Sequence, residues 1–256
     1  MRVTAIANQK GGVGKTSTCV NLCAGLGLMG KKVLLVDMDP QGNSTSGLGV
    51  ERGSLTQSVY ELLVDNAPFQ DCIRATGWKG VFLVPATIDL AGAEIELVSV
   101  MSRETRLKKC LESAQGYDQI IIDCPPSLGL LTLNSLVAAD SIIVPIQCEY
   151  YALEGLSQLM KTIDLVKSHL NSSLELDGLL LTMFDSRTRL SKDVAEEVRA
   201  RFSDKVYKTT IPRNVRISEA PSHGMPIQYY DSGSPGTTAY NKFTKEVVKR
   251  WQSRGA

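Results

Sequence analysis

Short apolar runs rich in β-branched residues alternate along the chain with longer segments of helical periodicity. The runs that predict strands are Val3–Ala7, Val33–Val36, Val81–Val84, Ile120–Ile122, Ser141–Ile146, Leu176–Met183 and Val206–Thr210. The segments that predict helices are residues 16–29, 55–64, 89–114, 129–138, 152–170, 190–202 and 236–252. Strands that are apolar on both faces and separated by helices predict a mostly parallel, buried sheet with right-handed crossovers.

The length of 256 residues suits one α/β domain with helices on both faces of a twisted sheet. We see no internal repeat, low-complexity block or linker, so residues 1–256 are expected to form a single domain. The chain begins almost directly with the first strand, and no apolar run approaches the ~20 residues that cross a membrane. A cytoplasmic location is therefore expected.

A glycine-rich segment follows the first predicted strand and precedes the first predicted helix. Residues 10–16 read Lys-Gly-Gly-Val-Gly-Lys-Thr. Phosphates require closely spaced backbone N–H donors, no Cβ in the way and the positive end of a helix, and glycines before a helix start supply all three. In such a loop Lys15 reaches the β- and γ-phosphates and the Thr16 hydroxyl binds Mg²⁺. The sequence therefore predicts a P-loop NTPase.

This loop departs from the usual pattern G-x-x-x-x-G-K-[ST] at its first position. Gln9 stands where that pattern has glycine, and Lys10 is present in addition to Lys15. Two lysines are more than one triphosphate usually needs. We therefore expect Lys10 to reach a second nucleotide across a dimer interface.

Acidic residues follow two of the predicted strands. Asp37 and Asp39 come after Val33–Val36, and Asp123 comes after Ile120–Ile122. Ligands of open parallel sheets collect at the carboxyl ends of the strands. Together with the two-lysine loop, these residues resemble the deviant Walker ATPases, and most closely the ParA/Soj family that partitions bacterial chromosomes and plasmids. The resemblance covers nearly the whole chain.

The resemblance implies roles for individual residues. Asp123 matches the position that holds Mg²⁺ through a coordinating water, and Asp39 matches the switch aspartate that orients or activates the attacking water. Lys10, Lys15 and Asp39 are thus the expected catalytic residues, and Thr16 and Asp123 the expected metal ligands. Asp37 has two open interpretations: it assists the metal shell, or it caps the end of its strand.

The expected nucleotide-binding residues extend beyond the phosphate loop. The segment 211–221 is similar to the one that closes over the adenine base in ParA/Soj proteins, which favours ATP. The full predicted set is Lys10, Gly11, Gly12, Val13, Gly14, Lys15, Thr16, Ser17, Pro212 and Asn214. Two loops, Pro40 to Val50 and Cys124 to Leu130, follow the aspartates and are expected to respond to the γ-phosphate.

Charge is unevenly distributed along the chain. The net formal charge is 28 minus 27, or +1, but residues 204–256 carry nine Lys/Arg and four Asp/Glu, a net of +5, which leaves −4 for the rest. Such asymmetry permits a basic face. Arg213 and Arg216 stand three apart and share a face if a helix forms there. Family members grip DNA with arginines at the positions of Arg187 and Arg216, so Arg187, Arg213 and Arg216 are the expected DNA contacts.

The resemblance implies an ATP-driven switch. Two subunits sandwich ATP, the homodimer holds double-stranded DNA without sequence preference, and a ParB/Spo0J-type partner stimulates weak intrinsic hydrolysis, which releases the DNA. The protein would then be nucleoid-associated.

Two alternatives share the phosphate loop. A MinD-like, membrane-associated division-site ATPase needs a detachable amphipathic C-terminal helix, and Phe243, Val247, Val248 and Trp251 would form its apolar stripe. However, that helix is expected to be the last docked element of the domain, so no stable membrane association is expected. Iron–sulfur carriers need converging thiolates, and Cys124, before two prolines, is poorly placed for one.

Overall fold

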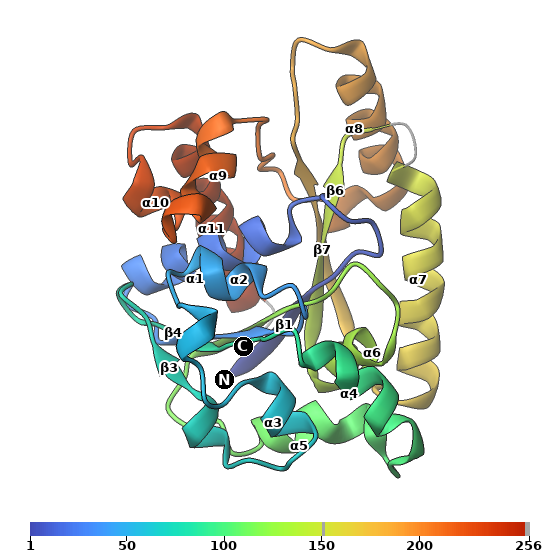
Figure 1. Ribbon diagram of the computed structural model, residues 1–256. Helices are drawn as coiled ribbons and strands as arrows, with labels where there is room; N and C mark the ends of the chain where they lie inside the picture. Colours follow the sequence, from blue (N-terminus) through green and yellow to red (C-terminus); the bar gives the residue numbers. More distant parts are fainter. Residues whose placement is uncertain (150–151, 254–256) are drawn as a thin grey trace.

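A computed structural model describes residues 1–149 and 152–253 of the chain. It contains one seven-stranded sheet in the order β3-β4-β2-β5-β1-β6-β7, flanked by helices on both faces (Figure 1). The strands are β1 (Arg2–Ile6), β2 (Val33–Asp37), β3 (Arg74–Ala75), β4 (Val81–Val84), β5 (Gln119–Asp123), β6 (Ser141–Gln147) and β7 (Glu175–Thr182). All neighbouring strands are parallel except β3 and β4. The predicted α/β class with a mostly parallel sheet is confirmed.

The helices follow the predicted alternation. They are α1 (Lys15–Leu28), α2 (Asn43–Gly47), α3 (Val59–Leu63), α4 (Leu90–Glu96), α5 (Arg106–Leu111), α6 (Leu130–Ala138), α7 (Ala152–His169), α8 (Arg189–Phe202), α9 (Val215–Glu219), α10 (Ile227–Tyr230) and α11 (Pro235–Ser253). Local sequence explains some boundaries. Ser58 and Glu61 form a capping box that starts α3, and the Thr188 hydroxyl caps α8.

Two predictions about secondary structure were wrong. Residues 206–210 do not form a strand: only isolated bridges join Val206 to Leu179 and Pro212 to Phe184. Between them, the backbone N–H groups of Lys208 and Thr209 donate to the carboxylate of Glu246 instead of a neighbouring strand.

The predicted helix over residues 89–114 is also interrupted. It divides into α4, the 3₁₀ turns Leu97–Ser99 and Arg103–Thr105, and α5. Val100 is extended, and Ser102 has a left-handed backbone with φ of 58°, which an α-helix does not accommodate. A short helix, α2, forms within the segment Pro40 to Val50.

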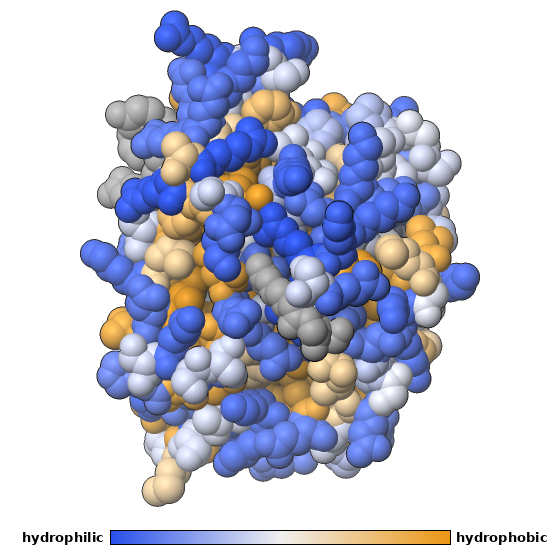
Figure 2. Space-filling view, turned by 180° about the vertical axis from the view of Figure 1, so that it is seen from behind, coloured by the Kyte–Doolittle hydropathy of each residue, from blue (hydrophilic) through white to orange (hydrophobic). Residues whose placement is uncertain are grey.

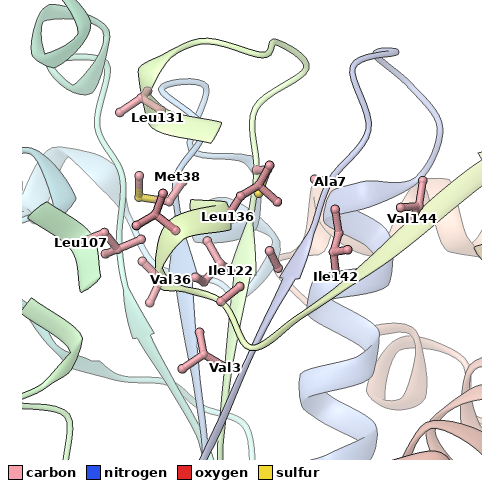
Figure 3. Packing of buried hydrophobic residues seen from close by; sticks show 14 of the residues in the cluster. Val3, Ala7, Val36, Met38, Leu107, Ile122, Leu131, Leu136, Ile142 and Val144 are labelled. Carbon is pink, nitrogen blue, oxygen red and sulfur yellow. The ribbon is translucent and has the colours of Figure 1, made fainter. Parts of the chain in front are cut away.

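Each face of the sheet carries its own hydrophobic core. Val36, Ile122 and Ile142 point to one face, where they pack with residues of α5 and α6 such as Leu107 and Leu136 (Figure 3). The alternate strand residues point to the other face, which α1, α10 and α11 cover. Because consecutive strand residues face opposite ways, strands buried on both faces must be apolar throughout.

The apolar stripe of α11 belongs to this second core. Phe243, Val247 and Trp251 are buried, and Val248 is partly buried against the same core. Among the described residues, none of the helices combines the length and apolar character that a membrane-spanning segment requires. On the face turned away from the viewer in Figure 1, hydrophilic side chains predominate and the apolar ones lie in separate small areas (Figure 2).

The close approach of the turn before β4 makes α1 depend on glycine. A Cβ built on Gly27 would lie 2.0 Å from the Lys79 carbonyl oxygen. We expect Gly27→Ala to lower the free energy of unfolding by about 2 kcal/mol, because backbone must shift to admit the methyl group. Thermal unfolding would show this as a fall in Tm of about 4–8 °C. Gly77→Ala is the matched control, since a Cβ there meets no atom within 4 Å. Equal Tm values for the two variants would contradict the prediction.

Candidate functional site

The candidate site lies where β1, β2 and β5 end. In register, Ile6 pairs with Asp123 and Asp37 pairs with Asp123, so the glycine loop after β1 and both acidic strand ends converge. A cavity of about 600 Å³ opens at this edge. Its lining is Gly11, Gly12, Gly14, Lys15, Thr16, Ser17, Asp39, Gln41, Asn43, Ser46, Gly47, Arg52, Pro126, Met183, Pro221 and Ser222. The structure therefore brings most of the predicted phosphate-loop residues and Asp39 to one cavity.

Positive backbone φ angles shape the glycine loop. Gly12 has φ of 72° and Gly14 has φ of 89°, a region that other residues rarely adopt. Helix α1 begins directly after Gly14. Val13 is buried, and its carbonyl oxygen accepts a hydrogen bond from the Thr182 hydroxyl at 2.8 Å, which anchors the loop to β7. The loop is thus a backbone concavity at a helix N-terminus, a geometry that binds anions.

Lys15 is the cation of this concavity. Only 6% of the residue is exposed, and its Nζ donates to the Lys10 carbonyl oxygen at 3.0 Å. Burial lowers the pKa of Lys15, and the charge of Asp123 opposes that shift. A phosphate would supply the additional anionic partner that a buried ammonium group favours.

Asp123 has the properties of a metal-binding carboxylate. It is fully buried; its Oδ2 accepts from the Ser44 hydroxyl at 2.8 Å, whereas Oδ1 has no hydrogen-bond partner among the described residues. Burial raises the pKa of Asp123, and the hydroxyls of Ser44 and Thr16 oppose the shift. A buried oxygen without a partner, next to a threonine hydroxyl, fits Mg²⁺ coordinated directly or through water.

Asp37 and Asp39 differ in their surroundings. Both oxygens of Asp37 accept local bonds: Oδ2 from the backbone N–H and hydroxyl of Thr45, Oδ1 from the backbone N–H of Asp39. This arrangement supports the interpretation that Asp37 caps the end of its strand, β2, and it also ties that strand end to Thr45 in α2. Burial, and then the charge of Asp123, raise its pKa. Asp39 lines the cavity, and its Oδ1 accepts from the backbone N–H of Gln41 at 2.9 Å.

Lys10 does not line the cavity's interior. Its Nζ lies 2.9 Å from Oε2 of Glu149, just after β6, and both side chains are about half exposed. The Gln147 amide donates to the other oxygen of Glu149 at 2.6 Å. Lys10 is thus held by its own chain in this structure, beside the loop that carries Lys15.

A second cavity adjoins the first and has a more apolar character. Its volume is about 360 Å³, and it shares Gly14, Ser17 and Met183 with the phosphate cavity. Pro212 and Asn214, both predicted from the resemblance, line it. The side-chain Oδ1 of Asn214 caps α9 by accepting from the backbone N–H of Ile217 at 3.4 Å, which leaves the side-chain Nδ2 for a ligand. An apolar slot next to a phosphate cradle suits a nucleobase.

The three candidate arginines lie on two adjoining segments. The bridge between Phe184 and Pro212 places the loop of Arg187 beside the segment of Arg213 and Arg216. One part of the prediction was wrong: α9 begins at Val215, so Arg213 precedes it and shares no helical face with Arg216.

Two of these arginines already have acidic partners. Arg187, 87% exposed, donates two hydrogen bonds to Asp185, and these bonds hold the pKa of that carboxyl well below its ordinary value. Arg216 lies 2.9 Å from Glu219 and 3.4 Å from Asp231. Phosphates would have to compete with these carboxylates.

Several residues of the site were not predicted from the sequence. Ser44 and Thr45 hold the two buried aspartates, and Glu149 holds Lys10. Arg52 lines the cavity and donates to the Gln41 carbonyl oxygen. The small polar residues of the Pro40 to Val50 loop were a usable signal, since buried carboxylates need nearby donors. Nothing in the sequence indicated Glu149, because its partner Lys10 lies 139 residues away along the chain.

This parallel sheet, with a glycine loop at its carboxyl edge and a buried carboxylate beside it, defines a P-loop nucleotide-binding protein. Residues 1–176 match a family described as an AAA domain. The sporulation initiation inhibitor protein Soj of Bacillus subtilis is 62% identical over 96% of this chain and 98% of its own. The chromosome partitioning protein ParA of Myxococcus xanthus is 54% identical over 97% of this chain and 88% of its own. The chain belongs to the ParA/Soj family of partitioning ATPases.

Solved structures agree with this assignment. A cobyrinic acid a,c-diamide synthase from Mycobacterium smegmatis with bound ADP and magnesium superposes with a TM-score of 0.87, at 42% identity, over 99% of this chain and 96% of its own. The septum site-determining protein MinD of Pyrococcus horikoshii, complexed with Mg-ADP, superposes with a TM-score of 0.78 at 28% identity. The match covers 96% of this chain and 95% of that chain. ATP and Mg²⁺ are accordingly the cofactors of this chain, which is an ATPase.

Proposed function

We propose that this protein is an ATP-driven switch of DNA segregation. ATP joins two subunits, the dimer retains double-stranded DNA without sequence preference, and hydrolysis separates the subunits and releases the DNA. The observation that carries the proposal is the half-exposed second lysine, Lys10, beside a phosphate loop that already has the buried Lys15. Lys15 serves the nucleotide of its own subunit, and Lys10 leaves its ion pair with Glu149 to serve the nucleotide of the neighbouring subunit.

Each residue of the cavity has a role in this proposal. The glycine loop and Lys15 hold the phosphates, and Thr16 and Asp123 hold Mg²⁺, which neutralises charge between the β- and γ-phosphates. Asp39, on the cavity wall, orients the attacking water. Pro212 and Asn214 receive adenine in the neighbouring slot. Intrinsic hydrolysis is weak because water positioning is completed only by a ParB/Spo0J-type partner.

DNA retention is assigned to the adjoining segments of Arg187, Arg213 and Arg216. The arginines of a single subunit neutralise few DNA phosphates. Pairing two subunits doubles the number of arginines on the basic surface. This explains why DNA binding would require ATP. It also implies a nucleoid-associated location in the cytoplasm.

The MinD-like alternative receives no support from the C-terminal helix. Its apolar residues are committed to the core of the domain, as Phe243 and Val247 are fully buried. Exposing them to a lipid surface would cost about 1.5–3 kcal/mol for each side chain.

The decisive experiment measures DNA retention with ADP, ATP and a non-hydrolysable ATP analogue at fixed salt. We expect retention with ATP and the analogue and little with ADP. Equal retention in all three states would refute the switch, and retention on anionic vesicles without DNA binding would favour the MinD-like alternative.

Arg216→Glu is expected to weaken DNA retention by about tenfold at 0.1 M salt, because each subunit loses one phosphate contact and gains a repulsive charge. Gel shifts with ATP would measure this, while nucleotide affinity stays unchanged. The charge-matched control is Lys31→Glu, at the amino end of β2 and therefore away from the cavity edge. The same loss in both variants would show that only net charge matters.

A further inference from the structure

Helix α2 is anchored by buried hydrogen bonds to the ends of two strands. The Ser44 hydroxyl donates to Oδ2 of Asp123 at 2.8 Å. The hydroxyl and the backbone N–H of Thr45 donate to Oδ2 of Asp37 at 2.7 Å and 2.8 Å, respectively. All four residues are fully buried, and a hydrogen bond to a buried carboxylate is strong because water does not compete for it. The start of α2 is therefore tied to the carboxyl ends of β2 and β5.

The same short helix forms part of the wall of the phosphate cavity. Asn43, Ser46 and Gly47 line that cavity, whereas Ser44 and Thr45 are fully buried. Helix α2 also lies beside α1, which begins at the phosphate loop (Figure 1). Neighbouring residues of α2 thus face the nucleotide cavity and hold the carboxylate that fits Mg²⁺.

The two anchors of α2 differ in what they leave available. Both oxygens of Asp37 accept hydrogen bonds, and the Thr45 hydroxyl oxygen also accepts from the backbone N–H of Ala86 at 3.0 Å. Ser44, in contrast, occupies only one oxygen of Asp123, and Oδ1 has no partner among the described residues. Because the two oxygens of a carboxylate share one rigid plane, holding Oδ2 restricts the direction of Oδ1. Oδ1 is then held ready for a cation or for a water bound to it.

We propose that Ser44 is a positioning residue of the metal site: its hydroxyl orients the Asp123 carboxylate for Mg²⁺ and couples metal binding to the position of α2. Loss of a group that holds a metal-binding carboxylate typically lowers metal affinity by about 10- to 100-fold. The coupling is reciprocal, so Mg²⁺ at Asp123 should in turn stabilise the start of α2. This inference rests on the role of Asp123 in the proposed function, and it requires neither the dimer nor DNA.

A purely structural hydrogen bond between Ser44 and Asp123 is the alternative. A buried carboxylate needs donors whether or not it binds a metal, so removing the hydroxyl would then lower the stability of the fold alone. A positioning role predicts, in addition, a changed dependence of nucleotide affinity on Mg²⁺. The two roles are therefore separated by a Mg²⁺ titration.

The first test measures the binding of a fluorescent ADP to the full chain at increasing Mg²⁺ concentration and, separately, in EDTA. ADP is used because the proposed switch leaves the ADP-bound protein monomeric, so dimerisation does not contribute. Ser44→Ala should raise the Mg²⁺ concentration that gives half of the metal's effect by about tenfold or more. Affinity in EDTA should change little, because the glycine loop and Lys15 are untouched.

Two further variants serve as controls in the same assay. Ser141→Ala removes another fully buried serine hydroxyl, which bonds to the Thr4 hydroxyl at 3.1 Å. Ser141 begins β6, at the edge of the sheet opposite the cavity, so this change should lower Tm without altering the response to Mg²⁺. Asp123→Asn changes the metal carboxylate itself and should weaken the response to Mg²⁺ at least as much as Ser44→Ala does.

The second test examines the coupling to α2 and begins with the unchanged protein. Hydrogen exchange of the backbone amides of residues 44–48 is measured with ADP in EDTA and with ADP and Mg²⁺, because exchange reports local opening. We expect Mg²⁺ to slow exchange in this segment. The slowing should be lost in Ser44→Ala and kept in Ser141→Ala.

Three results would overturn the proposal. If Ser44→Ala requires no more Mg²⁺ than the unchanged protein, or loses affinity equally in EDTA and in Mg²⁺, Ser44 has only a structural role. If Asp123→Asn responds normally to Mg²⁺, Asp123 does not hold the metal. If exchange in α2 of the unchanged protein does not respond to Mg²⁺, metal and helix are not coupled. DNA retention with ATP is measured separately, so a failure of the proposed switch is distinguished from all three.

Discussion

Replacing Asp39 by alanine should lower steady-state ATP hydrolysis by about 100-fold and leave the protein trapped as the ATP-bound dimer. Asp39 lies on the wall of the phosphate cavity with 7% of its surface exposed, so its carboxylate can reach a water beside the γ-phosphate. Lys15, Thr16 and the glycine loop are untouched by the change. Binding should therefore persist while the chemical step fails, and DNA should be retained for longer than with the unchanged protein.

The structure suggests a control that separates charge from local structure. Oδ1 of Asp39 accepts a hydrogen bond from the backbone N–H of Gln41, and alanine would remove it. Asp39→Asn retains an oxygen for that bond but loses the negative charge. If Asp39 acts on the attacking water, both variants should hydrolyse ATP slowly. Turnover restored in the asparagine variant would assign Asp39 a structural role instead, and normal turnover in both would remove it from the mechanism.

Local spacing was sufficient to predict the backbone arrangement around the glycine loop. The order of strand, glycine loop and helix is contained within residues 2–28, and the structure reproduces it with the left-handed backbone at Gly12 and Gly14. The position of the acidic residues at one edge of the sheet could also be predicted, because parallel strands end at a common edge. The sequence could not assign Asp37, because the choice depended on Thr45, whose hydroxyl and backbone N–H occupy its carboxylate.

Contacts between distant parts of the chain account for what the sequence did not predict. The apolar run at residues 206–210 has a strand-like composition, but the carboxylate of Glu246 on α11 takes two of its backbone donors. The pairing of Lys10 with Glu149 likewise joins residues far apart in sequence. Periodicity describes each segment by itself, so a side chain arriving from another element is invisible to it.

Lys10→Ala should keep much of the affinity for ATP and lose the ATP-induced dimer. In this structure Nζ of Lys10 is paired with Glu149 of the same chain, 2.9 Å away. Both side chains are about half exposed, and an ion pair of that kind contributes about 0–1 kcal/mol. Breaking the ion pair with Glu149 therefore costs little free energy. A neighbouring triphosphate is the stronger partner for Lys10, because it carries more negative charge in a less exposed setting. Sizing chromatography and a fluorescent ATP analogue measure dimerisation and binding separately.

Glu149→Gln is the matched control for the Lys10 variant. It removes the negative partner of Lys10 and leaves the lysine itself in place, so the dimer should form at equal or lower ATP concentration than in the unchanged protein. If Lys10 instead serves only to hold Glu149, the two substitutions should have the same effect on dimerisation. An ATP-induced dimer that survives Lys10→Ala would show that no lysine passes between subunits, and the sandwich arrangement would have to be abandoned.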